Sequence, residues 1–200
     1  MQVLPDGADG ATALALVGTI AHDGNGGVAD RFEEGAGVDA WLAEHFPGLS
    51  PRSGEGAERL RGIRFAARSA FAAAVAPHPA SRVERQRRMS DAEAGELLAA
   101  AVNALDTEYT VTIGKAGVRR GLATAATGQA LVEGTLALAV VDFLTGPSAP
   151  RLRSCQAPHC VRYFVQDHGR QQWCKASCGN RARVARHAQR QRLFRTVMQA

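Results

Sequence analysis

All four cysteines of this 200-residue chain lie in one short stretch near its C-terminus. They form two close pairs, Cys155-x4-Cys160 and Cys174-x3-Cys178, with thirteen residues between the pairs. A tetrahedral zinc ion needs four soft or borderline donors, and two close pairs supply them with only one long loop to close. We therefore predict that these four cysteines bind one structural Zn²⁺ ion.

Other uses of the cysteines have to be weighed against zinc. Two disulfides would explain an even number of cysteines, but the chain shows no signal peptide, and the cytoplasm, where we expect this protein, disfavours structural disulfides. A redox site usually has Cys-x2-Cys spacing, which neither pair has. His159 or His168 could replace one cysteine as ligand. Because four thiols suffice, we predict that both histidines lie at the surface.

The last cysteine opens the tetrapeptide Cys178-Gly-Asn-Arg181, which leads into a run rich in alanine and arginine. Residues 182–195 contain no proline or glycine and have high helix propensity. We predict a helix there, entered sharply at Gly179 and Asn180, with the second cysteine pair at its N-terminus.

The first cysteine pair is predicted to form a knuckle. Residues 161–165 and 171–173 are predicted to pair as a short hairpin, with Phe164 and Trp173 packed against the metal core. Knuckle, hairpin and terminal helix together predict a C-terminal treble-clef-like zinc finger.

The motif order Cys-x4-Cys-x3-Phe, followed by Trp-Cys-x3-Cys-Gly-Asn-Arg and a basic helix, resembles the CGNR zinc-finger family over about residues 151–195. Upstream, the segments at residues 15–19 and 38–42 and the order of elements are similar to the ABATE domain, a family of stress-induced transcription regulators. The two resemblances imply a zinc finger attached to a regulatory domain.

The net charge of the chain changes sign at about residue 151, where the resemblance to the zinc finger begins. Residues 151–200 contain eleven Arg or Lys and one acid, Asp167, whereas the rest of the chain contains thirteen basic and eighteen acidic residues. Arg183, Arg186 and Arg190 are spaced i, i+3 and i+7 and should share one helical face. A guanidinium can bind phosphates or the O6/N7 edge of guanine, so this face is the predicted nucleic-acid contact.

We therefore predict a zinc-binding, DNA-binding transcriptional regulator, with Lys175 and Arg181 on flanking phosphates. Duplex DNA is the expected partner, because no aromatic ladder accompanies the arginines. The alternative is a zinc-stabilised protein-interaction module that engages an acidic partner without specific nucleic-acid binding. A homodimer is a further expectation, since one small finger reads little sequence.

The chain is predicted to be mainly α with a small β-hairpin (α+β), in three parts: an N-terminal helical domain with the hairpin over 1–146, a linker over 147–152 and the finger over 153–200. Apolar content and periodicity predict helices over 11–20, 38–46, 58–75 and 127–144, and a capping box of Ser90 and Glu93 predicts a helix over 90–105. Residues 109–113 and 118–124 alternate as a hairpin. Residues 24–27 are predicted to be a turn, because they lack the Lys-Ser/Thr of a phosphate-binding loop.

Two helical segments carry more detailed predictions. In the segment 58–75, Leu60, Ile63, Ala67, Phe71 and Val75 are predicted to form the buried face, with Arg59, Arg61, Arg64 and Arg68 outside it. The segment 127–144 is the most apolar, but it is short and carries two acids, so we predict a central buried helix and no membrane contact. The basic cluster at 82–88 is predicted to be a solvated connection.

No arrangement for catalysis is visible in the sequence. A closed four-cysteine zinc site has no open position for substrate, and the scattered histidines and carboxylates match no triad or paired-carboxylate pattern. We therefore expect no enzymatic activity. A small-molecule effector in the N-terminal domain is the remaining expectation, with His22, Asp23 and Trp41 as the first residues to inspect.

Overall fold

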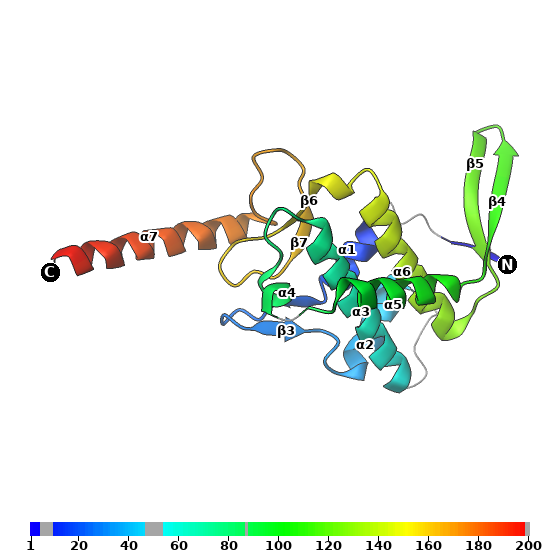
Figure 1. Ribbon diagram of the computed structural model, residues 1–200, viewed down its shortest axis with the longest axis horizontal. Coiled ribbons are helices and arrows are strands. Elements are labelled where there is room, and N and C mark those ends of the chain that lie inside the picture. The colour runs from blue at the N-terminus through cyan, green and yellow to red at the C-terminus, as the bar shows by residue number, and fades with distance from the viewer. Residues whose placement is uncertain (5–9, 47–53, 87, 199–200) are drawn as a thin grey trace.

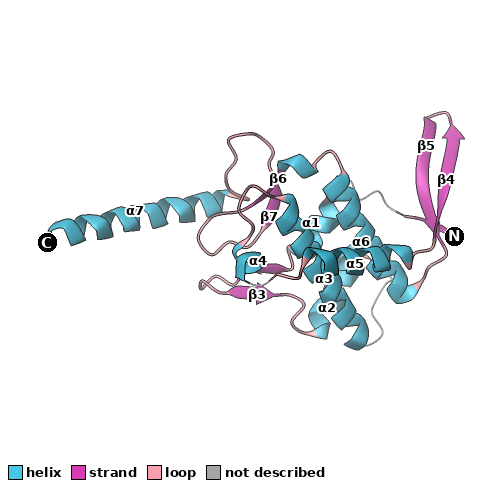
Figure 2. Ribbon diagram, in the orientation of Figure 1, coloured by secondary structure: helices cyan, strands magenta, loops and turns pink. Residues whose placement is uncertain are grey.

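A helical body carries two projections, as the computed structural model shows (Figures 1 and 2). The structure describes residues 1–4, 10–46, 54–86 and 88–198. A hairpin of β4 (Thr107–Gly114) and β5 (Gly117–Thr124) leaves the body at one end, and helix α7 (Ala176–Met198) leaves it at the opposite end. The mainly α fold with small sheets agrees with the prediction.

The body is built around the central helix α6 (Gly128–Thr145). The surrounding helices are α1 (Ala11–Val17), α2 (Gly35–His45), α3 (Gly54–Ala74), α4 (Arg82–Gln86) and α5 (Asp91–Asn103). Leu136, Val140 and Phe143 of α6 are fully buried, and the helix packs against α1, α3 and α5. By length and composition, α6 is the one helix in the described part of the chain that could cross a membrane, but 56% of it is buried inside the body. The prediction of a central buried helix is therefore confirmed.

Local chemistry explains where several elements begin and end. Ser90 caps α5, because its Oγ accepts from the Glu93 amide at 3.2 Å while the Glu93 carboxylate accepts from the Ser90 amide at 3.0 Å. Helix α1 ends at Val17, short of the predicted Ile20, because the Thr19 hydroxyl donates to the Leu16 carbonyl at 2.7 Å and the chain turns away.

Within the described residues, three small antiparallel sheets complete the fold. Strand β1 (Gln2–Val3), which the sequence did not predict, adds to the predicted hairpin to give the order β1-β5-β4. Strands β2 (Ile20–His22) and β3 (Val28–Asp30) pair around the glycine-rich segment 24–27, so the predicted turn is confirmed. Asp23 Oδ1 accepts from the amides of Asn25 and Gly27, at 2.8 Å and 2.9 Å, and thereby closes that turn.

The prediction that all four arginines of α3 lie outside the buried face is wrong for two of them. Arg64 is 0% exposed and Arg68 is 1% exposed. Arg64 pairs with Asp30, with Nη2 and Oδ2 at 2.8 Å, and its guanidinium carbon lies 5.0 Å from the centre of the Phe32 ring. A guanidinium can be buried when its N–H groups have fixed acceptors, and periodicity alone does not reveal those acceptors.

The prediction of a solvated connection at 82–88 is wrong for Arg82 and Glu84, whereas Arg85 and Arg88 are exposed. Residues 82–86 form α4, whose Glu84 is 6% exposed. Arg82 donates to the carbonyls of Gly26 and Gly27, at 3.1 Å and 3.0 Å. Arg82 therefore ties the β2–β3 turn to the body.

The finger begins with a 3₁₀ turn over Ala149–Arg151 and strand β6 (Leu152–Ser154). Strand β6 pairs with β7 (Tyr163–Val165), and Leu152 and Tyr163 belong to the main hydrophobic core of the body. The predicted pairing of 161–165 with 171–173 is therefore wrong. The Cys155 amide donates to the Arg162 carbonyl at 2.9 Å and continues the β6–β7 ladder to the first cysteine, which leaves residues 171–173 outside it.

Candidate metal centre

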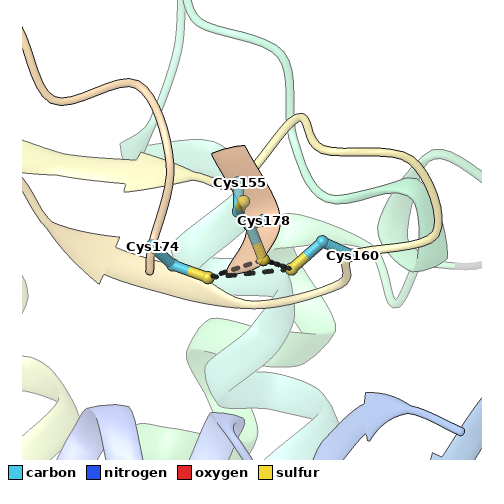
Figure 3. A group of neighbouring side chains, drawn as sticks. All are labelled: Cys155, Cys160, Cys174 and Cys178. Carbon is cyan, nitrogen blue, oxygen red and sulfur yellow. Dashed lines mark hydrogen bonds between the residues drawn. The ribbon is translucent and has the colours of Figure 1, made fainter. Parts of the chain in front are cut away.

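The four cysteine sulfurs converge on one point (Figure 3). All four lie within 4.8 Å of one another, and the Sγ–Sγ distances are 3.8 Å for Cys160–Cys174, 3.5 Å for Cys174–Cys178 and 3.8 Å for Cys160–Cys178. A tetrahedron with Zn–S bonds of about 2.3 Å has S–S edges of about 3.8 Å. A disulfide needs an S–S distance of about 2.05 Å, and all four cysteines are free thiols. The arrangement therefore fits zinc.

Each cysteine is positioned by a different turn or element end. Cys155 follows β6, and Cys160 closes a tight turn in which its amide donates to the Ala157 carbonyl at 3.0 Å. His159, in that turn, adopts a left-handed φ of 63° and is exposed. Cys174 precedes α7, and Cys178 lies in its first turn, fully buried. The predicted knuckle and the second pair at a helix N-terminus are both present, and the exposure of His159 and His168 agrees with the prediction.

Helix α7 starts earlier than predicted, at Ala176 rather than Ala182. The amides of Cys178 and Gly179 already donate to the Lys175 carbonyl, at 3.0 Å and 3.3 Å. Gly179 therefore lies inside the helix, where it serves close packing: a Cβ there would lie 3.0 Å from Trp173 Cδ1. Helix propensity predicts a start after Gly179 and Asn180, because both residues are poor helix formers. Packing overrides that preference here.

A small apolar shell covers the site. Phe164 is 8% exposed, Ala157 is 4% exposed, and Trp173 packs against the same cluster as the buried cysteines. The predicted packing of Phe164 and Trp173 against the metal core is confirmed. Such a shell limits the access of solvent to the metal.

The protonation of the thiols makes zinc binding depend on pH. In the metal-free protein a hydrogen bond with Cys160 is the main cause that raises the pKa of Cys155, to about 11. Hydrogen bonds with Cys155 and Cys160 raise the pKa of Cys174. The pKa of Cys160 is lowered, because Cys155 first and then Cys174 hydrogen-bond its thiolate. At neutral pH, Cys155 and Cys174 therefore carry protons that zinc must displace.

We accordingly expect zinc affinity to rise with pH. At any pH below its raised pKa, each of these two thiols carries a proton that zinc must displace. The zinc affinity should therefore rise roughly tenfold per pH unit for each displaced proton, and acid should release the metal. Competition with a chromophoric chelator between about pH 6 and about pH 8.5 measures this dependence. An affinity that does not change over this range would contradict the prediction.

Arg181 lies beside the metal site. Its Nη2 donates to Cys178 Sγ at 3.2 Å, and its Nε is buried without a hydrogen-bond partner in the described part of the chain. Four thiolates around one Zn²⁺ carry a net charge of −2, so a guanidinium at this distance stabilises the loaded site. The expected contact between Arg181 and a DNA phosphate competes with this position.

Replacing Arg181 by alanine should therefore weaken zinc binding by roughly tenfold to hundredfold, the range typical of groups that hold a metal ligand. Arg183→Ala is the matched control, because Arg183 is exposed and its guanidinium reaches only the Asn180 side chain among the contacts seen. Zinc transfer to a chelator measures both variants. Equal zinc retention in the two would show that the Arg181 contact contributes nothing.

The other predicted nucleic-acid residues lie on the free part of α7 or at its start. Arg183, Arg186 and Arg190 are exposed and, together with His187, line one shallow hollow on the helix. Lys175 is exposed just before α7. The helix extends away from the body (Figure 1), and no acidic residue occurs after Asp167.

A buried network that the sequence did not predict joins the finger to the body. Arg68 of α3 pairs with Glu84 of α4, with Nη2 and Oε2 at 3.0 Å, and donates to the carbonyls of Val17 and Val161, at 2.5 Å and 3.0 Å. Val161 follows the ligand Cys160. The partners are up to 93 residues apart in sequence, so no local pattern could have indicated the network.

Tyr163 of β7 belongs to the same network. Its hydroxyl donates to Glu84 Oε2 at 3.0 Å, and burial, followed by the nearby Glu84 charge, raises the pKa of Tyr163 above its usual range. Tyr163 therefore stays protonated and keeps donating to Glu84. This hydrogen bond connects β7 of the finger to α4 of the body.

The three residues predicted for an effector site do not form one site, because His22 Nδ1 lies 3.6 Å from Asp23 Oδ1 whereas the ring contacts of Trp41 are with other residues. Trp41 is 1% exposed, packs edge to face on Phe32 and stacks on His45. Asp23 closes the β2–β3 turn, and the ring of His22 lies edge-on to that of His159, with centroids 5.7 Å apart. Each side chain therefore has a structural contact of its own.

Two family models match the chain. The ABATE model, with the description "Putative stress-induced transcription regulator", matches residues 10–147, and the CGNR zinc finger model matches residues 151–191. No curated protein matches the chain. The second match spans all four cysteines and most of α7.

Proposed function

Because the chain belongs to the ABATE family and carries a CGNR zinc finger, we propose that it regulates transcription by binding duplex DNA through α7. In this proposal the zinc is structural and the protein is not an enzyme. Reduced, metal-binding cysteines fit a reducing compartment, so we place the protein in the cytoplasm.

One observation carries the proposal: the metal site holds the first turn of a projecting, basic helix. Cys178 lies in that turn, and α7 continues for twenty residues beyond it to Met198. Arg183, Arg186 and Arg190 are exposed along one side. A helix of this kind fits the major groove of B-DNA, which is about 12 Å wide.

We assign each basic residue of the finger a role from its position. The planar guanidiniums of Arg183, Arg186 and Arg190 can contact phosphates or the guanine edge in a bidentate manner. We assign Lys175, which is exposed just before the helix, to a flanking phosphate. Arg181 stabilises the metal site, so we assign it to zinc rather than to DNA.

The test is the triple replacement of Arg183, Arg186 and Arg190 by alanine. If these residues contact phosphates, the variant should bind duplex DNA more weakly, and the slope of log K against log salt should lose roughly 0.9 for each phosphate contact removed. The matched control replaces Arg85, Arg119 and Arg120, which are exposed elsewhere and remove the same charge. Equal losses of affinity in the two triple variants would contradict the proposed face.

The competing function, an interaction module for an acidic protein, has its own supporting observation. Val184, Phe194 and Met198 are 69%, 70% and 72% exposed on α7. A basic helix with exposed apolar side chains could bind an acidic amphipathic helix. Absence of DNA binding by the zinc-loaded wild type, with capture of such a peptide, would favour this function over DNA binding.

A further inference from the structure

The β4–β5 hairpin ends its sheet with an unpaired edge. In the order β1-β5-β4, strand β4 has a neighbour on one side only, among the residues that the structure describes. The eight residues of β4 pair continuously with β5, from Thr107↔Thr124 to Gly114↔Gly117. Because Gly114 and Gly117 close the turn, the odd-numbered residues of β4 direct their amide and carbonyl groups outward along the free edge.

The same odd-numbered residues carry large exposed apolar side chains. Tyr109, Val111 and Ile113 are 65%, 59% and 79% exposed, and Val118, opposite Ile113 on β5, is 70% exposed. Proteins usually protect such an edge with a proline, a bulge or a lysine pointing along the strand, and β4 has none of the three. The edge is therefore a template for another strand.

We propose that the partner strand is β4 of a second copy, paired antiparallel about a two-fold axis at Val111. In this register Val111 faces Val111 of the partner subunit, and Tyr109 faces the partner's Ile113. On the other side of the sheet, Thr110 faces the partner's Thr112. The outward backbone groups of the odd-numbered residues then bond one another, and each large apolar side chain gains an apolar neighbour.

Charge supports edge pairing and opposes stacking of the two hairpins face to face. Glu108 would lie opposite the partner's Gly114, beside the partner's Lys115, so one pair of opposite charges would lie at each end of the new ladder. Stacking would instead place Arg120, which lies opposite Val111 on the apolar face, against the partner's Arg120.

The position of the hairpin has a consequence for DNA binding that rests on the proposed function. The hairpin and α7 lie at opposite ends of the molecule (Figure 1). A dimer joined through β4 would hold its two α7 helices far apart. It would therefore bridge two DNA segments rather than occupy adjacent half-sites one helical turn apart.

A designed cysteine tests the register. In zinc-loaded Val111→Cys protein, mild oxidation should form a disulfide between the two introduced thiols, one from each copy, because facing residues of an antiparallel pair lie within disulfide reach. Val118→Cys is the control, because Val118 is at least as exposed, at 70% against 59% for Val111, and lies on β5 rather than on the β4 edge. A covalent dimer formed no faster in Val111→Cys than in Val118→Cys would overturn the proposal.

Sedimentation of the wild type and of two charge variants gives an independent test. Val111→Lys should weaken the dimer at least about tenfold, because two lysines would face each other across the axis, whereas Val118→Lys should leave it unchanged. Both sites are exposed, so circular dichroism should show intact folds. A wild type that is monomeric at all concentrations, or equal weakening by both variants, would refute the pairing. Neither test involves DNA, so its outcome is independent of the proposed function.

Discussion

Replacing Cys178 by serine is expected to release the zinc ion and unfold the finger. Cys178 is fully buried and joins the metal site to the first turn of α7, so its loss removes one ligand and the anchor of the helix together. Structural zinc contributes about 10–16 kcal/mol of apparent folding free energy in zinc-finger peptides, and a site with three thiolates and a hydroxyl retains only part of it.

The zinc content per chain and the helical circular dichroism signal measure this effect. Ser177→Ala is the matched control, because Ser177 is the neighbouring residue and is exposed. The control variant should hold stoichiometric zinc. The prediction fails if the Cys178→Ser protein keeps a full zinc equivalent and an unchanged resistance to chelator.

Replacing Arg68 by methionine should destabilise the body by about 3–5 kcal/mol, because it leaves the Glu84 carboxylate buried without its partner. The side chains of Arg68 and Glu84 are 1% and 3% exposed. Since Arg68 also donates to the Val161 carbonyl next to Cys160, we expect the same variant to lose zinc to a chelator more readily.

Urea unfolding measures the first effect and chelator competition the second. Arg59→Met on the same helix is the control. Arg59 is 53% exposed and pairs with Glu133, which is 16% exposed but also accepts from Gln129, so the loss of this solvent-accessible arginine should cost only about 1 kcal/mol. A second variant, Arg68→Met with Glu84→Leu, should recover part of the loss, because it removes the unpaired charge. Equal destabilisation by Arg68→Met and Arg59→Met would contradict the proposed role of the buried pair.

The metal site could be predicted from the sequence because its ligands and the residues that cover them lie in one short segment. Two cysteine pairs of short spacing, with an aromatic residue near each, suffice to define donors and shell. The central helix and the α5 cap were predictable for the same reason, since a hydrophobic run and the Ser90–Glu93 capping box are both read from adjacent residues.

The features that could not be predicted depend on residues far apart in sequence. Periodicity predicts Arg64 and Arg68 to lie at the surface. It cannot reveal their acceptors, Asp30 and Glu84, because these lie on other elements. Strand β7 pairs with β6 rather than with the nearer segment 171–173, because β6 also supplies Leu152 to the body core. In each case tertiary packing overrode a local pattern.

The central claim, that zinc holds a DNA-binding helix in place, is tested most directly by duplex binding of zinc-quantified protein across a salt series, with and without chelator. We predict binding that weakens steeply with salt, by roughly −0.9 in the slope for each phosphate contact, and that is lost when the chelator removes zinc. Equal DNA affinity of the zinc-loaded and zinc-free proteins, or no binding by the loaded protein at low salt, would contradict the claim.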